Sequence, residues 1–106
     1  MINNKIKIKI PIKELEKESV YPKVEKVLMN DPENAYTTIG IMIVAFRVKE
    51  EDIYNKSFSA WKEGLPTLYG RVDRSLRKMV KEGKAKVAKN GRAWVYWWVG
   101  ESKSRN

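Results

Sequence analysis

The sequence predicts an α+β fold that is mainly helical, with a C-terminal β-hairpin and an extra N-terminal strand. Three observations lead to this prediction. Residues 66–82 carry apolar side chains at helical spacing on one side and cations on the other. Residues 84–99 hold two strand-like runs around Asn90-Gly91, the dipeptide that type I′ hairpins favour. Residues 5–12 alternate lysine and isoleucine, as a strand with two different faces does.

The N-terminal strand over residues 5–12 has one isoleucine face and one lysine face. Pro11 cannot donate to a ladder, which favours an edge position or the end of the strand. A short helical turn is expected over residues 13–18. A separate helix is then expected to begin near Pro22, with proline at its first position, and to stop before Asp31. The side chains that this helix would bury are Val24, Val27 and Leu28.

A short extended link is expected over residues 35–37, followed by a helix over residues 39–48. Either Thr38 or Thr37 is a suitable cap, because a threonine hydroxyl can accept a hydrogen bond from the first helical turn. The helix carries apolar residues on nearly every side, which predicts full burial.

A further helix is expected to start at the acidic residues 49–52, since carboxylates are favourable at a helix N-terminus. It would end near Lys62, with Glu63-Gly64-Leu65 as the turn into the next helix. A short turn with glycine between two helices is the helix-turn-helix arrangement. The apolar face of this helix would be Ile53, Tyr54, Phe58 and Trp61.

The helix over residues 66–82 is the most informative element, because its two sides differ so strongly. The side expected to face the core holds Leu68, Val72, Leu76, Met79 and Val80. At about 100° per residue, the opposite side carries four cations and no acid. That side consists of Thr67, Gly70, Arg74, Arg77, Lys78 and Lys81.

The hairpin follows directly, with Asn90-Gly91 as its expected turn. In that register Val87 faces Trp94, and the face with Trp94, Tyr96 and Trp98 is expected to cover the core. The alternative use of these aromatic residues is a base-stacking platform for single strands. Trp97 lies on the other face, opposite Lys84, where a protein interface or a cation–π contact with Lys84 is expected.

The charge distribution indicates a surface that binds a polyanion. The chain of 106 residues fits one domain, and its net charge is +9. Residues 1–60 hold ten Lys/Arg and nine Asp/Glu, whereas residues 61–106 hold twelve and four. The excess of cations is therefore concentrated in the basic helix and the hairpin.

Several functional classes are disfavoured by the composition. The sequence has no cysteine and no histidine, which removes disulfides, thiolate sites, the usual general base and the commonest metal ligand. The acidic residues have no metal-site spacing and are read as solvated faces. No nucleotide loop or nucleophile motif occurs, so no enzyme, cofactor or metal is expected. No apolar run resembles a signal peptide or a membrane span, and a cytoplasmic location is expected.

Residues 74–83 and 85–96 resemble the end of the recognition helix and the wing of small prokaryotic and archaeal winged helix-turn-helix regulators. The resemblance covers about residues 20–99, preceded by the N-terminal strand and a short helical arm over residues 1–19. Residues 100–106 are expected to be a frayed tail.

The resemblance implies a dimeric transcriptional regulator that binds double-stranded DNA, with the helix 66–82 in the major groove and the wing 84–99 on the backbone. The dimer contact is expected at Ile6, Ile8 and Ile10, with Trp97 as the alternative. The candidate DNA contacts are Thr67, Gly70, Arg71, Arg74, Arg77, Lys78, Lys81, Lys84, Lys86, Lys89, Asn90 and Arg92.

Three other interpretations stay open. The N-terminal strand is similar to that of ribbon-helix-helix proteins, in which Lys5, Lys7 and Lys9 would read DNA. A plasmid or viral protein that partitions or organises DNA would use the same surface. A winged-helix adaptor in a larger complex would instead bind a protein partner, and its binding would lack the strong salt dependence of DNA binding.

Overall fold

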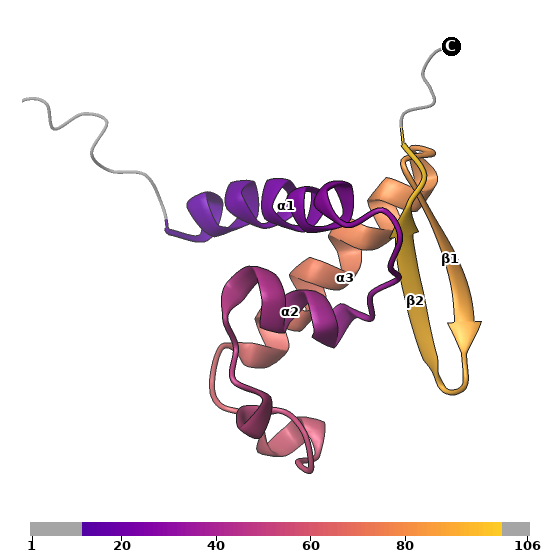
Figure 1. The fold of residues 1–106 in the computed structure, drawn as a ribbon. Helices are drawn as coiled ribbons and strands as arrows, with labels where there is room; N and C mark the ends of the chain where they lie inside the picture. The colour runs from indigo at the N-terminus through magenta and orange to yellow at the C-terminus, as the bar shows by residue number, and fades with distance from the viewer. Residues whose placement is uncertain (1–11, 101–106) are drawn as a thin grey trace, which may run out of the picture.

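The computed structural model describes residues 12–100, in which three α-helices are followed by a two-stranded antiparallel hairpin (Figure 1). The fold is therefore α+β, as the sequence predicts. The strand expected over residues 5–12 lies outside the described residues, except for Ile12, which begins a helix. The elements are α1 (Ile12–Asn30), α2 (Thr38–Phe46), α3 (Leu65–Lys81), β1 (Ala85–Asn90) and β2 (Ala93–Trp98).

Helix α1 runs through Pro22, so the prediction of a helix that begins there is wrong. Val20, Val24 and Leu28 are all buried and lie four residues apart, on one stripe that continues past the proline. Proline inside a helix costs about 3 kcal/mol because it lacks the N–H donor. Burial of Val20 recovers about 1.5–3 kcal/mol of that cost. The apolar stripe therefore keeps the helix continuous, and the short turn expected over residues 13–18 is part of α1.

Helix α2 is capped by Thr37, one of the two threonines that the sequence offers. The Thr37 hydroxyl accepts a hydrogen bond from the Gly40 amide at 2.9 Å. The helix ends at Phe46, earlier than predicted, because Arg47 adopts a left-handed conformation with φ of 56°.

The prediction that α2 is fully buried is wrong. Ile41 and Met42 are inaccessible to solvent, but Val44 is 54% exposed. Helices α1 and α3 both pack against α2 and leave its remaining side open. An entirely apolar helix sequence predicts burial on all sides only where neighbours are available on all sides.

No α-helix forms over residues 49–62, contrary to prediction. Two 3₁₀ turns occur instead, Glu50–Asp52 and Phe58–Ala60, and Asn55 between them has a left-handed φ of 65°. Asparagine and serine compete with helical hydrogen bonds through their own side chains, which explains the break. The connection between α2 and α3 thus spans residues 47–64 and projects beyond the helices (Figure 1), in place of the predicted helix and the turn that was expected to follow it.

The connection is fastened to α3 by aromatic contacts. Ile53 is buried, and the Phe58 ring lies 4.7 Å from the Trp61 ring, measured between centroids. Both rings also contact Tyr69 of α3, with centroid separations of 5.7 and 5.9 Å. Phe58 remains 52% exposed, so only part of the predicted apolar face is covered.

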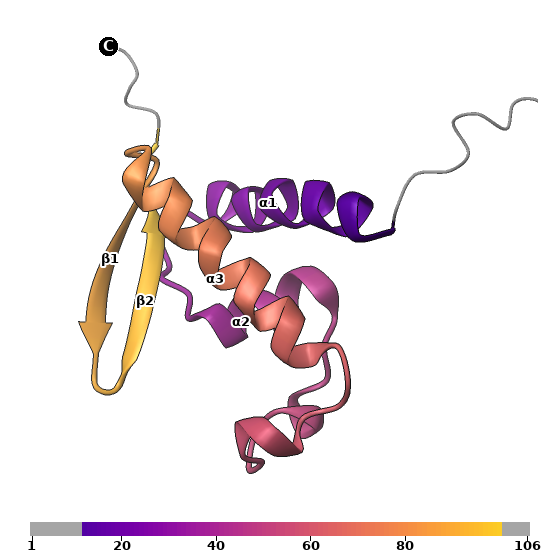
Figure 2. The ribbon, with the colours of Figure 1, turned by 180° about the vertical axis from the view of Figure 1, so that it is seen from behind.

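Helix α3 confirms the predicted division into two sides. Val72, Leu76 and Met79 have no accessible surface, and Leu68 and Val80 pack against them. The helix begins after Gly64, whose φ of 94° favours glycine. Figure 2 shows α3 in front of α1 and α2, with the hairpin beside it. The side of α3 that faces the viewer in Figure 2 is therefore the side away from the other helices.

The hairpin has the predicted strands but a different turn. Its register pairs Asn90 with Ala93, so Gly91 and Arg92 are the turn residues. Type I′ turns need positive φ at both turn residues, and only Gly91 has it, with φ of 68°. The register differs from the predicted one by two residues, and a shift of two keeps every side chain on its face.

The hairpin is joined to the entrance of α2. Tyr36 and Tyr96 exchange two backbone hydrogen bonds of 2.8 Å, which confirms the extended link predicted over residues 35–37. Tyr96 is buried, and Trp98 packs against the core beside it. Trp94 is 52% exposed, so the prediction that this whole face covers the core is wrong at Trp94.

Candidate nucleic-acid interface

The side of α3 that points away from the core is open to solvent. Arg74 lies near the centre of this side, about half a turn from the buried Val72 and Leu76. Of the predicted contact residues on α3, Gly70 and Arg71 are partly buried. The exposed ones are Thr67, Arg74, Arg77, Lys78 and Lys81.

The hairpin lies beside α3 (Figure 2) and carries a second set of cations. Lys86, Lys89, Asn90 and Arg92 are all exposed, and the last three lie at or next to the turn. The Lys89 ammonium lies 5.2 Å from the centroid of the Trp94 ring, a cation–π distance. Residues 65–98 together contain nine Lys/Arg and only two Asp/Glu.

Several of these cations have no carboxylate partner among the side chains that the structure describes. No carboxylate among residues 20–100 lies within ion-pair distance of Arg74, Lys81, Lys86 or Arg92. Charges without a counter-charge on neighbouring elements add up to a potential that attracts polyanions. The open face of α3 and the hairpin therefore form one cationic surface.

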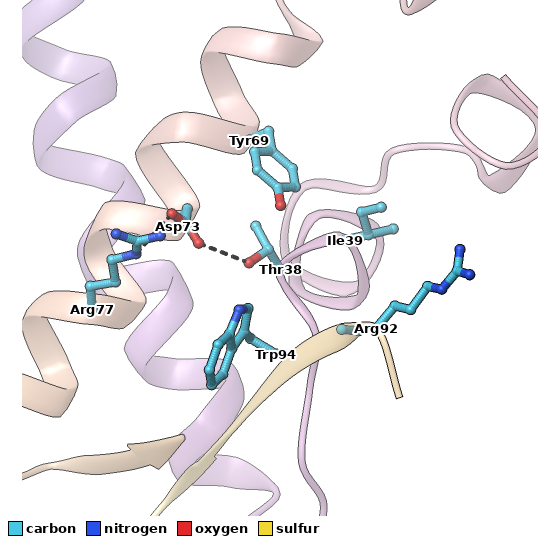
Figure 3. A pocket seen from close by; sticks show the side chains of 8 residues that line it. Thr38, Ile39, Tyr69, Asp73, Arg77, Arg92 and Trp94 are labelled. Atoms are coloured by element: carbon cyan, nitrogen blue, oxygen red, sulfur yellow. Dashed lines mark hydrogen bonds and ion pairs between the residues drawn. The ribbon is translucent and has the colours of Figure 1, made fainter. Parts of the chain in front are cut away.

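Arg77 lies at the edge of this surface, where α3 meets α2. Its Nε is 3.1 Å from Oδ2 of Asp73, one helical turn earlier. The Thr38 hydroxyl of α2 donates to Oδ1 of the same carboxylate at 3.3 Å (Figure 3). An exposed ion pair at this spacing stabilises a helix by only about 0.3–0.5 kcal/mol.

Tyr96 of β2 reaches the same place from the hairpin. Burial is the largest cause that raises the pKa of its hydroxyl. The charge of Asp73 raises this pKa further, whereas Arg77 lowers it. Both effects require that the three side chains lie close together. The meeting point of α2, α3 and β2 is thus a polar seam rather than an apolar contact.

The seam opens into a hollow of about 330 Å³ between α3, the start of α2 and the hairpin (Figure 3). Trp94 forms one wall from β2, and Arg92 extends from the hairpin turn at the rim. Arg77 of α3 and Arg92 of the hairpin both line this hollow. Its lining residues are Thr38, Ile39, Tyr69, Asp73, Arg77, Arg92, Ala93 and Trp94.

Lys84, another predicted contact residue, has a different environment. Its ammonium donates to Glu25 at 3.0 Å and to the Tyr21 hydroxyl at 3.3 Å, both on α1. Glu82 lies 3.7 Å away and accepts a hydrogen bond from the Tyr21 hydroxyl. The hydrogen bond to Glu25, followed by the one to Tyr21, raises the pKa of Lys84 above its usual value. Lys84 therefore fastens α1 to the base of the hairpin.

Of the residues predicted to form the dimer contact, the structure describes Trp97 but not the three isoleucines. Trp97 is half-buried and lies opposite Lys86, not Lys84, because of the register shift. The Lys84 ammonium instead lies 5.4 Å from the ring centroid of Tyr21, which also has Lys78 at 5.2 Å. Ile6, Ile8 and Ile10 lie outside the described residues.

Two residues of the seam are missing from the predicted site. Asp73 precedes Arg77 by four residues, a spacing that indicates an ion pair on a helix and is visible in the sequence. Thr38 is 35 residues from Asp73 in sequence, and no local pattern indicates that contact.

Other kinds of site find no support within residues 12–100. This part of the chain has no group of three or more His, Cys, Asp or Glu side chains that would hold a metal ion. None of its helices has the length and apolar character needed to cross a membrane.

Replacement of Lys84 by methionine is expected to destabilise the fold, because it removes the ammonium that holds Glu25 and Tyr21. Charge-assisted hydrogen bonds at a partly exposed site are worth about 1 kcal/mol, which corresponds to a fall in Tm of about 4–8 °C. Lys86→Met is the matched control and should leave Tm nearly unchanged, since no carboxylate among residues 20–100 lies within ion-pair distance of Lys86. Thermal unfolding followed by circular dichroism measures both, and equal Tm values would contradict the role given to Lys84.

Comparison of the chain with protein-family models, with curated proteins and with solved structures gives no significant match in any of the three.

Proposed function

We propose that this protein binds double-stranded DNA, with α3 in the major groove and the hairpin on the sugar–phosphate backbone. The observation that supports this most strongly is the cationic surface, on which the open sides of α3 and the hairpin lie together (Figure 2). Uncompensated cations on two adjoining elements match a phosphate backbone better than they match a small anion.

The dimensions of the two partners agree. An α-helix with its side chains is about 10–12 Å wide, and the major groove of B-DNA is about 12 Å wide. Arg74 and Arg77 project from the exposed side of α3 and have the planar fork that suits guanine O6 and N7. Gly70 has no side chain, and the guanidinium of Arg74 lies over it, since a Cβ at Gly70 would stand 3.6 Å from Nη1 of Arg74.

The remaining exposed cations suit phosphates, which position a protein without reading sequence. Lys81 extends the surface at the end of α3, and Lys86, Lys89 and Arg92 extend it along the hairpin. We assign Lys84 to the packing of α1 and not to DNA, because its ammonium is already bound by Glu25.

The order of elements supports a winged helix-turn-helix protein, and with it a transcriptional regulator. Helices α1, α2 and α3 precede the hairpin, and Tyr36 adds a short extended segment to β2 between α1 and α2. The connection over residues 47–64 is a departure, since it replaces a tight turn. The basic helix and the hairpin nevertheless stand next to each other, as DNA contact by a helix and a wing requires.

A titration of a labelled 20-base-pair duplex of random sequence tests the proposal. The logarithm of the binding constant should fall linearly with the logarithm of salt concentration, with a slope of about −4 or steeper for five or more phosphate contacts. Weak binding with no dependence on salt would overturn the proposed function. Selection of duplexes from a random pool then separates a regulator, which enriches one site, from a protein that organises DNA without strong preference.

The adaptor interpretation has one specific observation in its favour. Tyr54 and Phe58 on the connection are 47% and 52% exposed, and exposed aromatic side chains are frequent at protein interfaces. This alternative predicts a protein partner on the connection and no salt-dependent binding of duplex DNA. The same titration therefore distinguishes the two functions.

Arg74→Ala and Arg77→Ala are each expected to weaken binding to the selected duplex by about 1–3 kcal/mol where the side chain reads a base. At least one of them should also relax the preference at a single base-pair position. The measurement is binding to the selected duplex and to its single-position variants. If both variants bind all of these duplexes like wild type, α3 is not the recognition helix.

The double variant Lys89→Gln, Arg92→Gln is expected to weaken binding to all duplexes by a similar factor. Each lost phosphate contact should reduce the magnitude of the salt slope by about 1. Both residues lie at the hairpin tip, where they would reach the backbone without contacting bases. Loss of sequence preference with an unchanged salt slope would contradict this assignment of the hairpin.

The protein is also proposed to act as a homodimer, because a single small module contacts little DNA and a two-fold site is the usual remedy. We expect deletion of residues 1–11 to convert the dimer to a monomer in sedimentation equilibrium, since this deletion removes Ile6, Ile8 and Ile10. Trp97→Ala is the companion variant. A full-length monomer at tens of micromolar would refute the dimer, and a truncated dimer would move the contact to Trp97.

A further inference from the structure

Asp73 is the single acidic residue in the sequence of α3, which also carries five lysines and arginines. Its carboxylate is bound on both oxygens, by Nε of Arg77 at 3.1 Å and by the Thr38 hydroxyl at 3.3 Å. The Asp73 side chain is 22% exposed and that of Arg77 is 71% exposed. The carboxylate is thus held in the seam, and the guanidinium of Arg77 lies beside it (Figure 3).

This arrangement fixes the direction of Arg77 before any ligand binds. The ion pair uses Nε, one of the five N–H donors of a guanidinium, and leaves donors on the outer nitrogens for another partner. The Tyr96 hydroxyl of β2 interacts with the same guanidinium and takes up part of this donor capacity. An arginine that is already held in one orientation loses less freedom when it binds than a free one does.

The same carboxylate carries a charge that is unfavourable next to DNA. A phosphate displaced toward the seam would meet the negative charge of Asp73, whereas a guanine edge in front of Arg77 would not. Non-specific binding consists almost entirely of phosphate contacts, so this charge weakens it. A group that repels the wrong arrangement contributes to discrimination even while it lowers total affinity.

On the basis of the proposed DNA-binding function, we infer that Asp73 is a positioning residue that sets base-pair discrimination. It acts by holding the guanidinium of Arg77 toward the bases and by opposing phosphates that approach the seam. Thr38 supports it from α2, so the discrimination depends on the packing of α2 against α3. The ion pair itself contributes little to stability, because its arginine is largely exposed.

The test compares two dissociation constants for each variant, one for the duplex selected by wild type and one for a random duplex. Their ratio measures discrimination. Asp73→Asn keeps an acceptor for Thr38 but removes the charge that holds Arg77. We expect the random duplex to bind more tightly and the ratio to fall about tenfold, within the range for one base-reading arginine. Thr38→Val should lower the ratio by a smaller factor.

Glu63→Gln is the matched control, because Glu63 is exposed just before α3 and also carries one negative charge. It should change the binding of both duplexes by the same factor and leave the ratio unchanged. A second control places Asp73→Asn in an Arg77→Ala background. In this background the substitution should lower the ratio by a smaller factor than in wild type, because no guanidinium is left to position and only the repulsion of phosphates is lost.

Each result decides the question. An unchanged ratio in Asp73→Asn, an equal fall in Glu63→Gln, or the full tenfold fall in the Arg77→Ala background would overturn the inference while the DNA-binding function stands. Wild type that binds neither duplex in a salt-dependent way would overturn the proposed function, and the inference with it. Thermal unfolding of each variant shows whether a change in the ratio arises from loss of the fold.

Discussion

Burial of one side of α3 is the constraint on which the rest of the structure depends. Val72, Leu76 and Met79 have no accessible surface, and α1, α2 and β1 all pack against this helix. A rotation of α3 by one residue, about 100°, would expose these side chains and push Arg77 or Lys78 toward the core. Burial of an unpaired charge costs several kcal/mol. The hydrophobic effect, rather than any attraction among the charges, therefore fixes the direction in which the cations point.

Two polar fastenings hold the outer elements on this helix. The backbone pair between Tyr36 and Tyr96 joins the hairpin to the entrance of α2. The ammonium of Lys84 joins the base of the hairpin to Glu25 on α1. The first fastening uses only main-chain groups and satisfies donors and acceptors that a free strand edge would leave open. The second lies at the far end of α3, so the two together align the hairpin along the helix.

The elements with strong periodicity were predictable from the sequence, and those fixed by tertiary contacts were not. The two sides of α3 follow directly from the spacing of Leu68, Val72 and Leu76. The continuity of α1 through Pro22 was not predictable, since it depends on the burial of Val20 by partners distant in sequence. The prediction of a helix over residues 49–62 was wrong because the apolar residues there alternate with residues that favour turns.

In the candidate site, too, sequence reasoning predicted the features that depend on local pattern but not the contacts between distant residues. The exposed cations of α3 and of the hairpin were predictable, because local pattern determines exposure on a helix and on a strand. The capture of Lys84 by Glu25 and the contact of Thr38 with Asp73 were not, because each joins residues more than 30 positions apart. The local sequence pattern therefore identified the cationic surface. Tertiary packing decided which of its residues are bound by other side chains of the protein.

The position of the Tyr36 bridge divides the hairpin into two mechanical parts. Tyr96 is tied to Tyr36, and the next residue along the chain, Thr37, caps α2. Between this tie and the tip, the described part of β2 pairs only with β1. The outer half of the hairpin is thus attached to the rest of the described structure at one end only, at Tyr96. The tip would bend around a curved ligand while Tyr96 stays in place. A displacement that reached Tyr96 would be transmitted through Tyr36 to the first turn of α2.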